Sequence, residues 1–228
     1  MTTYINTNNS DIIRAENIKY LDIRIKQIRT MLEDEEDIEK AIIELLITAL
    51  CEHGKDENQI RQISQISKIL GEALGLDIQY CTCLGQAALI YDIGNIAISS
   101  EIYKKDNTLS FEEFSIVKNH TLMGYEILIA QGFASTKMGA LISAEHHEWW
   151  NGGGYPRQLK EIEISILSRI VAVADTVGAL YRVRPGRKAW EFNKIINYIQ
   201  ERDGLQFSPE VVKAFLDKQE SIYEVLSS

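Results

Sequence analysis

The sequence predicts an all-α protein on three observations. Apolar residues recur at intervals of three and four along nearly the whole chain, the spacing that gives a helix one apolar face. Alternating apolar and polar residues, typical of strands, are scarce, and only three prolines interrupt 228 residues. Because 45% of the residues are hydrophobic, a chain of this length can bury a substantial core, and one soluble domain with an appendage is expected.

Two helices are expected near the N-terminus. Apolar spacing predicts the first at residues 18–32 and the second at residues 38–49. The acidic run 33–37 separates them, and Asp34 or Asp37 is expected to cap the second helix. The first helix is either a short coiled coil, which would dimerise or transmit a signal, or a helix that packs on its own domain.

The same spacing predicts further helices near residues 59–75, 78–91, 111–131, 137–150, 162–183, 188–202 and 209–226. Ser208 and Pro209 mark the start of the last one, since serine is a favoured N-cap and proline a favoured first helical residue. Glycines 152–154 and the segment 184–187 are the clearest interruptions.

Composition excludes several classes of protein. A net charge of −9 argues against nonspecific binding to DNA, RNA or an anionic membrane, which needs an excess of Lys and Arg. No apolar run reaches the roughly 18 residues that span a bilayer, and the polar N-terminus lacks the apolar segment of a signal peptide. The three cysteines have no framework spacing, and Cys81 and Cys83 are expected to be buried thiols rather than metal ligands. We therefore expect a cytoplasmic protein.

Two carboxylates interrupt apolar segments of the chain, Asp92 and Asp175. Since a buried, unpaired carboxylate is costly, each should accept hydrogen bonds, pair with a cation or bind a metal. The plainer alternative is a helix-end cap or a hydrogen-bonded core acid. Of the four histidines, His120, His146 and His147 fall in the same region as both acids, which favours a metal site.

The segment from His146 to Pro156 is the most informative stretch of the chain. It holds two adjacent histidines, a glycine-rich turn and the pair Tyr155-Pro156. Adjacent side chains diverge by about 100° on a helix, so His146 and His147 can share a metal only at a helix end, which the glycines provide. The segment therefore predicts a metal site with a small anionic ligand beside it.

These residues resemble the HD-GYP branch of the HD phosphohydrolases. The resemblance is carried in collinear order by residues 74–77, 91–94, 120, 146–156 and 172–175. It runs from Ala49 to Leu216. Active members of that family hydrolyse cyclic di-GMP with two or three metal ions in an all-helical bundle. The resemblance implies an HD-GYP-like helical bundle at residues 49–228, preceded by an N-terminal helical extension at residues 1–48.

Four departures from the family fall at positions that would bind metal or stabilise phosphate charge. Where the family has the histidine of its His-Asp signature, this chain has Tyr91, whose phenol is a poor metal ligand at neutral pH. Asn95 replaces a lysine that would stabilise phosphate charge. Lys55 and Gln59 stand where the resemblance places a glutamate and a histidine, so Lys55 puts a positive charge at a carboxylate position.

The resemblance implies a complete ligand set for one metal, made of Asp92, His120, His146 and His147. The neighbouring metal keeps only Asp175 and a share of Asp92. Three imidazoles and a carboxylate are expected to hold one Fe, Mn or Zn ion. A second and a third metal are not expected.

The side of the family site that holds the nucleotide is better preserved. Tyr155 matches the tyrosine of the Gly-Tyr-Pro loop, and Arg184 and Arg187 resemble basic positions that contact the phosphates of the cyclic dinucleotide. Guanidinium groups suit phosphate oxygens. The alternative for the two arginines is an ordinary exposed turn.

The leading interpretation is a degenerate HD-GYP signalling domain that binds a metal, cyclic di-GMP or both as a regulatory module, with weak or no hydrolysis. The second is an active metal-dependent cyclic di-GMP phosphodiesterase that yields pGpG or GMP. The third is a structural partner without metal or ligand, which dimerises through the N-terminal helices. A homodimer or a signalling protein bound through those helices is the expected protein partner.

Overall fold

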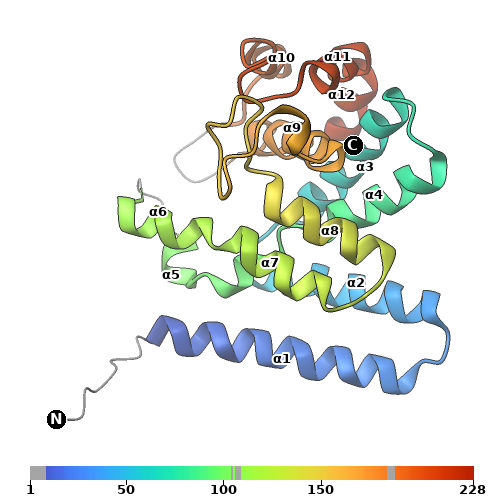
Figure 1. Ribbon diagram of the computed structural model, residues 1–228, viewed down its shortest axis with the longest axis vertical. Helices are drawn as coiled ribbons and strands as arrows, with labels where there is room; N and C mark the ends of the chain where they lie inside the picture. The colour runs from blue at the N-terminus through green and yellow to red at the C-terminus, as the bar shows by residue number, and fades with distance from the viewer. Residues whose placement is uncertain (1–8, 104, 106–108, 184–187) are drawn as a thin grey trace.

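The computed structural model describes residues 9–103, 105, 109–183 and 188–228. These residues form helices joined by turns and loops, with no strand among them (Figure 1), which confirms the predicted all-α class. The α-helices are α1 (Asn9–Met31), α2 (Glu35–Glu52), α3 (Glu57–Ala73), α4 (Ile78–Ile90), α5 (Ser100–Tyr103), α6 (Phe111–Lys118), α7 (His120–Ile129), α8 (Ala134–Glu145), α9 (Ile166–Tyr181), α10 (Phe192–Gln200), α11 (Pro209–Asp217) and α12 (Gln219–Ser227). Two short 3-10 helices are η1 (Ile93–Ala97) and η2 (Glu161–Glu163). In the part of the chain described, no helix is both long enough and apolar enough to cross a bilayer.

The two N-terminal helices lie side by side along one edge of the bundle (Figure 1). The Asp34 carboxylate accepts two backbone N–H groups of the first turn of α2 and so caps this helix, as predicted. Leu21 and Ile25 of α1 are buried against the chain's own core. α1 therefore packs on its own chain. Dimerisation through α1 stays a prediction, as does a domain boundary between residues 48 and 49, which falls inside α2.

Two predicted helices are broken in the structure. The helix expected at residues 111–131 is divided at Asn119 into α6 and α7, and the last predicted helix is divided at Lys218 into α11 and α12. Lys218 has φ −114° and ψ 14°, outside the helical region. α11 begins at Pro209, as predicted, but the Ser208 side chain makes no capping hydrogen bond.

Among the described residues, the hydrophobic core consists of two neighbouring clusters. One lies between α3, α4, α9 and the C-terminal helices, and the other lies between α1, α2, η1 and α7. Tyr91 belongs to the first cluster, whereas Ile90 and Ile93 belong to the second. Asp92 is therefore placed where the two clusters meet, in apolar surroundings that make its charge depend on specific partners.

Candidate metal centre

The junction between α4 and η1 positions Asp92. Its backbone stands at the N-cap of η1, but its side chain makes no capping hydrogen bond. A Cβ atom on Gly94 would lie 1.9 Å from the carbonyl oxygen of His120 and 2.6 Å from the backbone nitrogen of Gly124. Only a residue without a side chain permits this approach of two backbone segments. The close packing of η1 on α7 therefore holds Asp92 beside His120.

Three histidines converge next to Asp92 from two helices that lie side by side (Figure 1). His120 begins α7, His146 is the C-cap of α8, and His147 follows it. The helix predicted at residues 137–150 ends earlier, at Glu145. Both adjacent histidines therefore lie at the end of α8. One ring nitrogen from each of the three lies within 4.8 Å of the others.

Backbone carbonyl groups determine which nitrogen carries the proton in two of these rings. Nδ1 of His120 lies 2.7 Å from the carbonyl oxygen of Val117, and Nδ1 of His146 lies 3.0 Å from that of Ser143. Because a carbonyl oxygen only accepts hydrogen bonds, Nδ1 is the donor and each neutral ring presents a lone pair at Nε2. The two Nε2 atoms are 3.3 Å apart. Two lone pairs therefore face each other, and a cation between them would remove their repulsion.

The spacing and charge of these donors fit one divalent transition metal. Metal–nitrogen bonds of about 2.0–2.1 Å in a tetrahedral arrangement put two ligand nitrogens roughly 3.3 Å apart. The Nε2 atoms of His120 and His146 have this separation. Oδ1 of Asp92 lies 3.4 Å from Nε2 of His120 and 3.9 Å from Nε2 of His146. Three imidazoles and one carboxylate oxygen form a set that suits Zn, Fe or Mn.

The surroundings keep these groups in the protonation states that bind metal. Burial lowers the pKa of His146 and lowers the pKa of His147 well below the ordinary value. Burial alone would raise the pKa of Asp92, but the Lys55 ammonium holds it well below its usual range. Metal binding requires neutral imidazoles and an ionised carboxylate, and these are the forms that the folded protein favours.

The metal-free protein is expected to lose stability as the pH falls from about 7 to about 5. A histidine with a lowered pKa in the folded state contributes stability above its unfolded pKa of about 6.5, and this is lost as the pH falls towards the folded pKa. Urea unfolding at a series of pH values measures the slope of the unfolding free energy against pH. His147→Gln should reduce the slope, and His53→Gln, which is outside the cluster, should reduce it less. Stability that stays constant or rises on acidification would contradict the prediction.

The other half of the site does not fit a second ion. The Lys55 ammonium forms an ion pair with Oδ2 of Asp92, so a cation lies where the resemblance places a carboxylate ligand. The Tyr91 hydroxyl donates a hydrogen bond to Oδ1 of Asp175 at 2.7 Å. A phenol therefore holds Asp175, and the role of Asp175 as a metal ligand stays a prediction.

The remaining two departures also have partners within the chain. Oε1 of Gln59 accepts a hydrogen bond from Arg182 at 2.8 Å, and Nε of Arg182 lies 3.5 Å from Oδ2 of Asp56. Nδ2 of Asn95 donates to the backbone carbonyl of Asp92 at 2.9 Å. All four departures are therefore built into the packing of this site by hydrogen bonds or ion pairs.

The glycine-rich loop places Tyr155 beside the histidines. The backbone N–H of Tyr155 donates to the carbonyl of His147 at 3.1 Å, and the two rings stack with centroids 4.7 Å apart. A Cβ atom on Gly154 would lie 2.4 Å from the same carbonyl oxygen, so this position requires glycine. Arg184 and Arg187 lie outside the described residues, and their contact with a phosphate stays a prediction.

Two buried acids that the sequence analysis missed support this loop. Oε2 of Glu145 accepts a hydrogen bond from the backbone N–H of Ser165 at 2.9 Å. The Glu148 carboxylate accepts the backbone N–H groups of Arg157 and Leu159 at 2.6 and 3.1 Å. The two acids lie directly before and after the histidine pair in the sequence, and both are buried. Their position next to the histidines is the sequence signal that could have identified them as part of the site.

The sequence of this chain is similar to those of known proteins. Residues 41–211 match the HD domain family. A cyclic di-GMP phosphodiesterase from Thermotoga maritima is 38% identical over 164 residues, which cover 72% of this chain and 45% of that protein. The cyclic di-GMP phosphodiesterase response regulator RpfG from Xanthomonas campestris pv. campestris is 31% identical over 205 residues, which cover 89% of this chain and 54% of that protein. The chain spans about half the length of these curated relatives.

The fold matches that of solved structures as well. An HDG"Y"P protein from Bdellovibrio bacteriovorus superposes with a TM-score of 0.60, covering 95% of this chain and 74% of that chain. Its sequence is 17% identical, so this likeness shows the fold alone. The family match, in contrast, spans most of the chain and includes the three histidines and Asp92. This chain belongs to the HD-GYP branch of the HD domain family.

Proposed function

We propose that this chain is a signalling domain that holds one divalent transition metal and hydrolyses cyclic di-GMP weakly or not at all. The proposal rests on one observation: the two carboxylate oxygens of Asp92 have different partners. Its Oδ1 atom faces His120 and His146, whereas its Oδ2 atom pairs with the Lys55 ammonium. One half of the site is thus arranged for a metal, and the other half already contains a cation.

The loss of the second metal position would affect catalysis more than binding. Two-metal hydrolysis depends on ions roughly 3.5–4 Å apart, which stabilise both the attacking and the leaving oxygen. When bound, a single ion supplies Lewis acidity on one side of the substrate. On the other side, Lys55 is paired with Asp92 and Tyr91 with Asp175, so neither side chain would coordinate a second ion.

Tyr155 and Lys118 support binding of a phosphate-containing ligand beside the metal. Burial, followed by the negative charges of Asp92 and Asp175, raises the pKa of the Tyr155 phenol, so this hydroxyl stays a hydrogen-bond donor at neutral pH. The Lys118 ammonium lies 5.1 Å from the centre of the Tyr155 ring. A donor and a cation beside the histidines suit a cyclic dinucleotide, and Arg184 and Arg187 are proposed to add further phosphate contacts.

The second candidate is an active cyclic di-GMP phosphodiesterase. The set of His120, His146, His147 and Asp92 favours it, because an ion that accepts a water as fifth ligand beside these four could still activate that water. The similarity to the Thermotoga maritima phosphodiesterase favours it as well. The two candidates differ in turnover and agree in metal binding.

Anaerobically purified protein loaded with Fe²⁺ or Mn²⁺ should convert less than one equivalent of cyclic di-GMP per chain. Incubation with excess nucleotide, followed by chromatographic separation of pGpG and GMP, measures this. Calorimetry on the same sample measures binding separately from turnover, and the Thermotoga maritima relative serves as a positive control. Multiple turnovers that His147→Ala abolishes would establish the second candidate instead.

A further inference from the structure

Three cationic or phenolic side chains occupy the half of the site that lacks metal ligands. Lys55 pairs with Asp92, and Tyr91 donates to Asp175. Arg182 donates to Gln59 at 2.8 Å. These side chains come from separate elements of the chain, since Lys55 lies between α2 and α3, Tyr91 ends α4, and Arg182 ends α9. Each of the three side chains therefore has a polar partner within the chain.

The two carboxylate oxygens of Asp92 face different partners. Oδ2 contacts the Lys55 ammonium, while Oδ1 lies 3.4 and 3.9 Å from the Nε2 atoms of His120 and His146. A carboxylate that bridges two metal ions divides its oxygens in the same way, one for each ion. Lys55 therefore stands in the geometric relation to Asp92 that a second ion would have.

The charge of Lys55 opposes a second ion beside Asp92. Lys55 is largely buried, with 17% of its side chain exposed, so its charge is only weakly screened. A divalent ion entering this space would meet the ammonium at close range.

We propose that Lys55 is a built-in substitute for the second metal ion. Its ammonium neutralises one oxygen of the bridging carboxylate Asp92, so the site contains one fixed cation and one exchangeable cation. The inference rests on the proposed single-metal function and explains how the site keeps its geometry with one metal. A chelator can remove the exchangeable ion, whereas the fixed charge remains and continues to hold Asp92 in place.

Restoring the missing ligands should create a second metal position. The triple variant Lys55→Glu/Gln59→His/Tyr91→His removes the fixed cation and supplies three ligands. Metal-free protein is titrated with Mn²⁺, and bound metal is counted by atomic absorption. Electron paramagnetic resonance then distinguishes an isolated Mn²⁺ from two exchange-coupled ions. We expect one isolated Mn²⁺ per chain in the wild type and two coupled ions in the triple variant.

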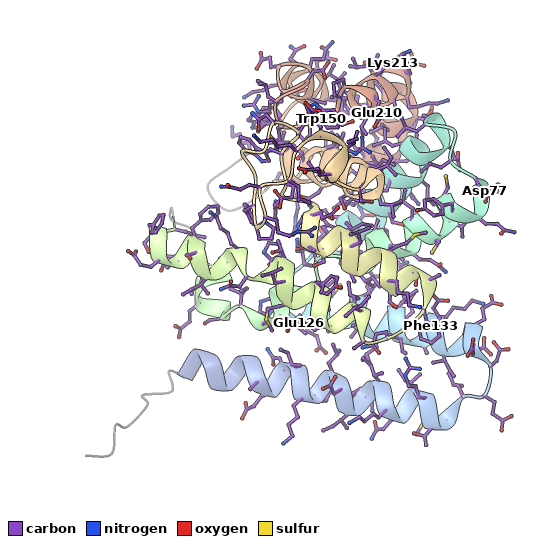
Figure 2. The ribbon with its side chains drawn as sticks, in the orientation of Figure 1. Asp77, Glu126, Phe133, Trp150, Glu210 and Lys213 are labelled. Atoms are coloured by element: carbon purple, nitrogen blue, oxygen red, sulfur yellow. The ribbon has the colours of Figure 1, made fainter. Side chains whose placement is uncertain are left out.

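A second variant and a control keep the test decisive if the triple variant does not fold. Lys55→Gln removes only the charge, and it should raise Mn²⁺ affinity at the three-histidine site by about tenfold or more, because one repelling cation is gone. Lys213 is exposed on α11, at the outer edge of the C-terminal helices (Figure 2). Lys213→Glu should leave affinity and metal count unchanged.

The outcomes separate this inference from the proposed function. A folded triple variant that binds only one Mn²⁺, or a Lys55→Gln variant with wild-type affinity, overturns the role of Lys55 and leaves the single-metal function standing. One Mn²⁺ in the wild type together with multiple turnovers of cyclic di-GMP overturns the proposed function and leaves the role of Lys55 standing. Two Mn²⁺ ions in the wild type overturn both.

Discussion

Replacing His146 with alanine is expected to abolish metal binding, with the affinity for Mn²⁺ falling more than about 100-fold. Its Nε2 atom lies 3.3 Å from Nε2 of His120, and its ring centroid lies 4.0 Å from that of His147. Loss of a group that merely orients a ligand costs about 10–100-fold in affinity. Removal of the ligand itself should cost more. Calorimetric titration of metal-free protein with Mn²⁺ measures the change.

His53→Ala is the matched control for this experiment. His53 is the C-cap of α2 and lies outside the three-histidine cluster, so this variant should bind metal like the wild type. Circular dichroism should show the same helical content in both variants. If folded His146→Ala kept the wild-type affinity, the metal would have to bind elsewhere, and the ligand set described above would be wrong.

The Gly94→Ala variant should lose about 3 kcal/mol or more of unfolding free energy, at or beyond the upper end of the usual range for overpacking. The added methyl group would lie 1.9 Å from the carbonyl oxygen of His120 and 2.6 Å from the nitrogen of Gly124. Both are backbone atoms, so no rotamer change relieves the clash, and η1 must move away from α7. Metal affinity should fall as well, because Asp92 moves with η1. Urea unfolding and Mn²⁺ titration measure the two effects.

Gly139→Ala provides a control with the same chemical change in a neighbouring helix. A Cβ atom on Gly139, within α8, would approach the Leu128 side chain at 3.3 Å, and this methyl group can shift. Alanine is favoured over glycine inside a helix by about 1 kcal/mol. The variant should therefore be about as stable as the wild type or slightly more stable. Equal stability of Gly94→Ala and Gly139→Ala would rule out the close contact between η1 and α7.

Apolar spacing predicted the helical class and most helices but not where a predicted helix is interrupted. The predicted helix at residues 111–131 breaks at Asn119, and the last one breaks at Lys218. Both α11 and α12 bury their apolar side chains in the same core cluster, so the periodic pattern continues across the break. A pattern of this kind records which face is buried, whereas a break depends on packing between helices.

The candidate site was predictable in its residue types and less so in its contacts. The pair His146-His147 before a glycine-rich turn indicated a shared site at a helix end, and Asp92 and His120 were candidates from their places in the sequence. The family resemblance joined all four residues into one predicted ligand set. The supporting acids Glu145 and Glu148 were missed, because their backbone partners lie beyond the loop and become neighbours only after folding.

By itself, the sequence determined that this protein is helical and that it belongs with the HD-GYP proteins. The resemblance also predicted that Lys55 and Tyr91 replace two metal ligands. Only the tertiary structure decided what those replacements do. Tyr91 and Asp175, which form a hydrogen bond, are 84 residues apart in the chain, and Lys55 reaches Asp92 from the turn before α3. Electrostatic energy depends on the distance between charges in space, so the proposed balance between one metal and one fixed cation can exist only in the folded chain.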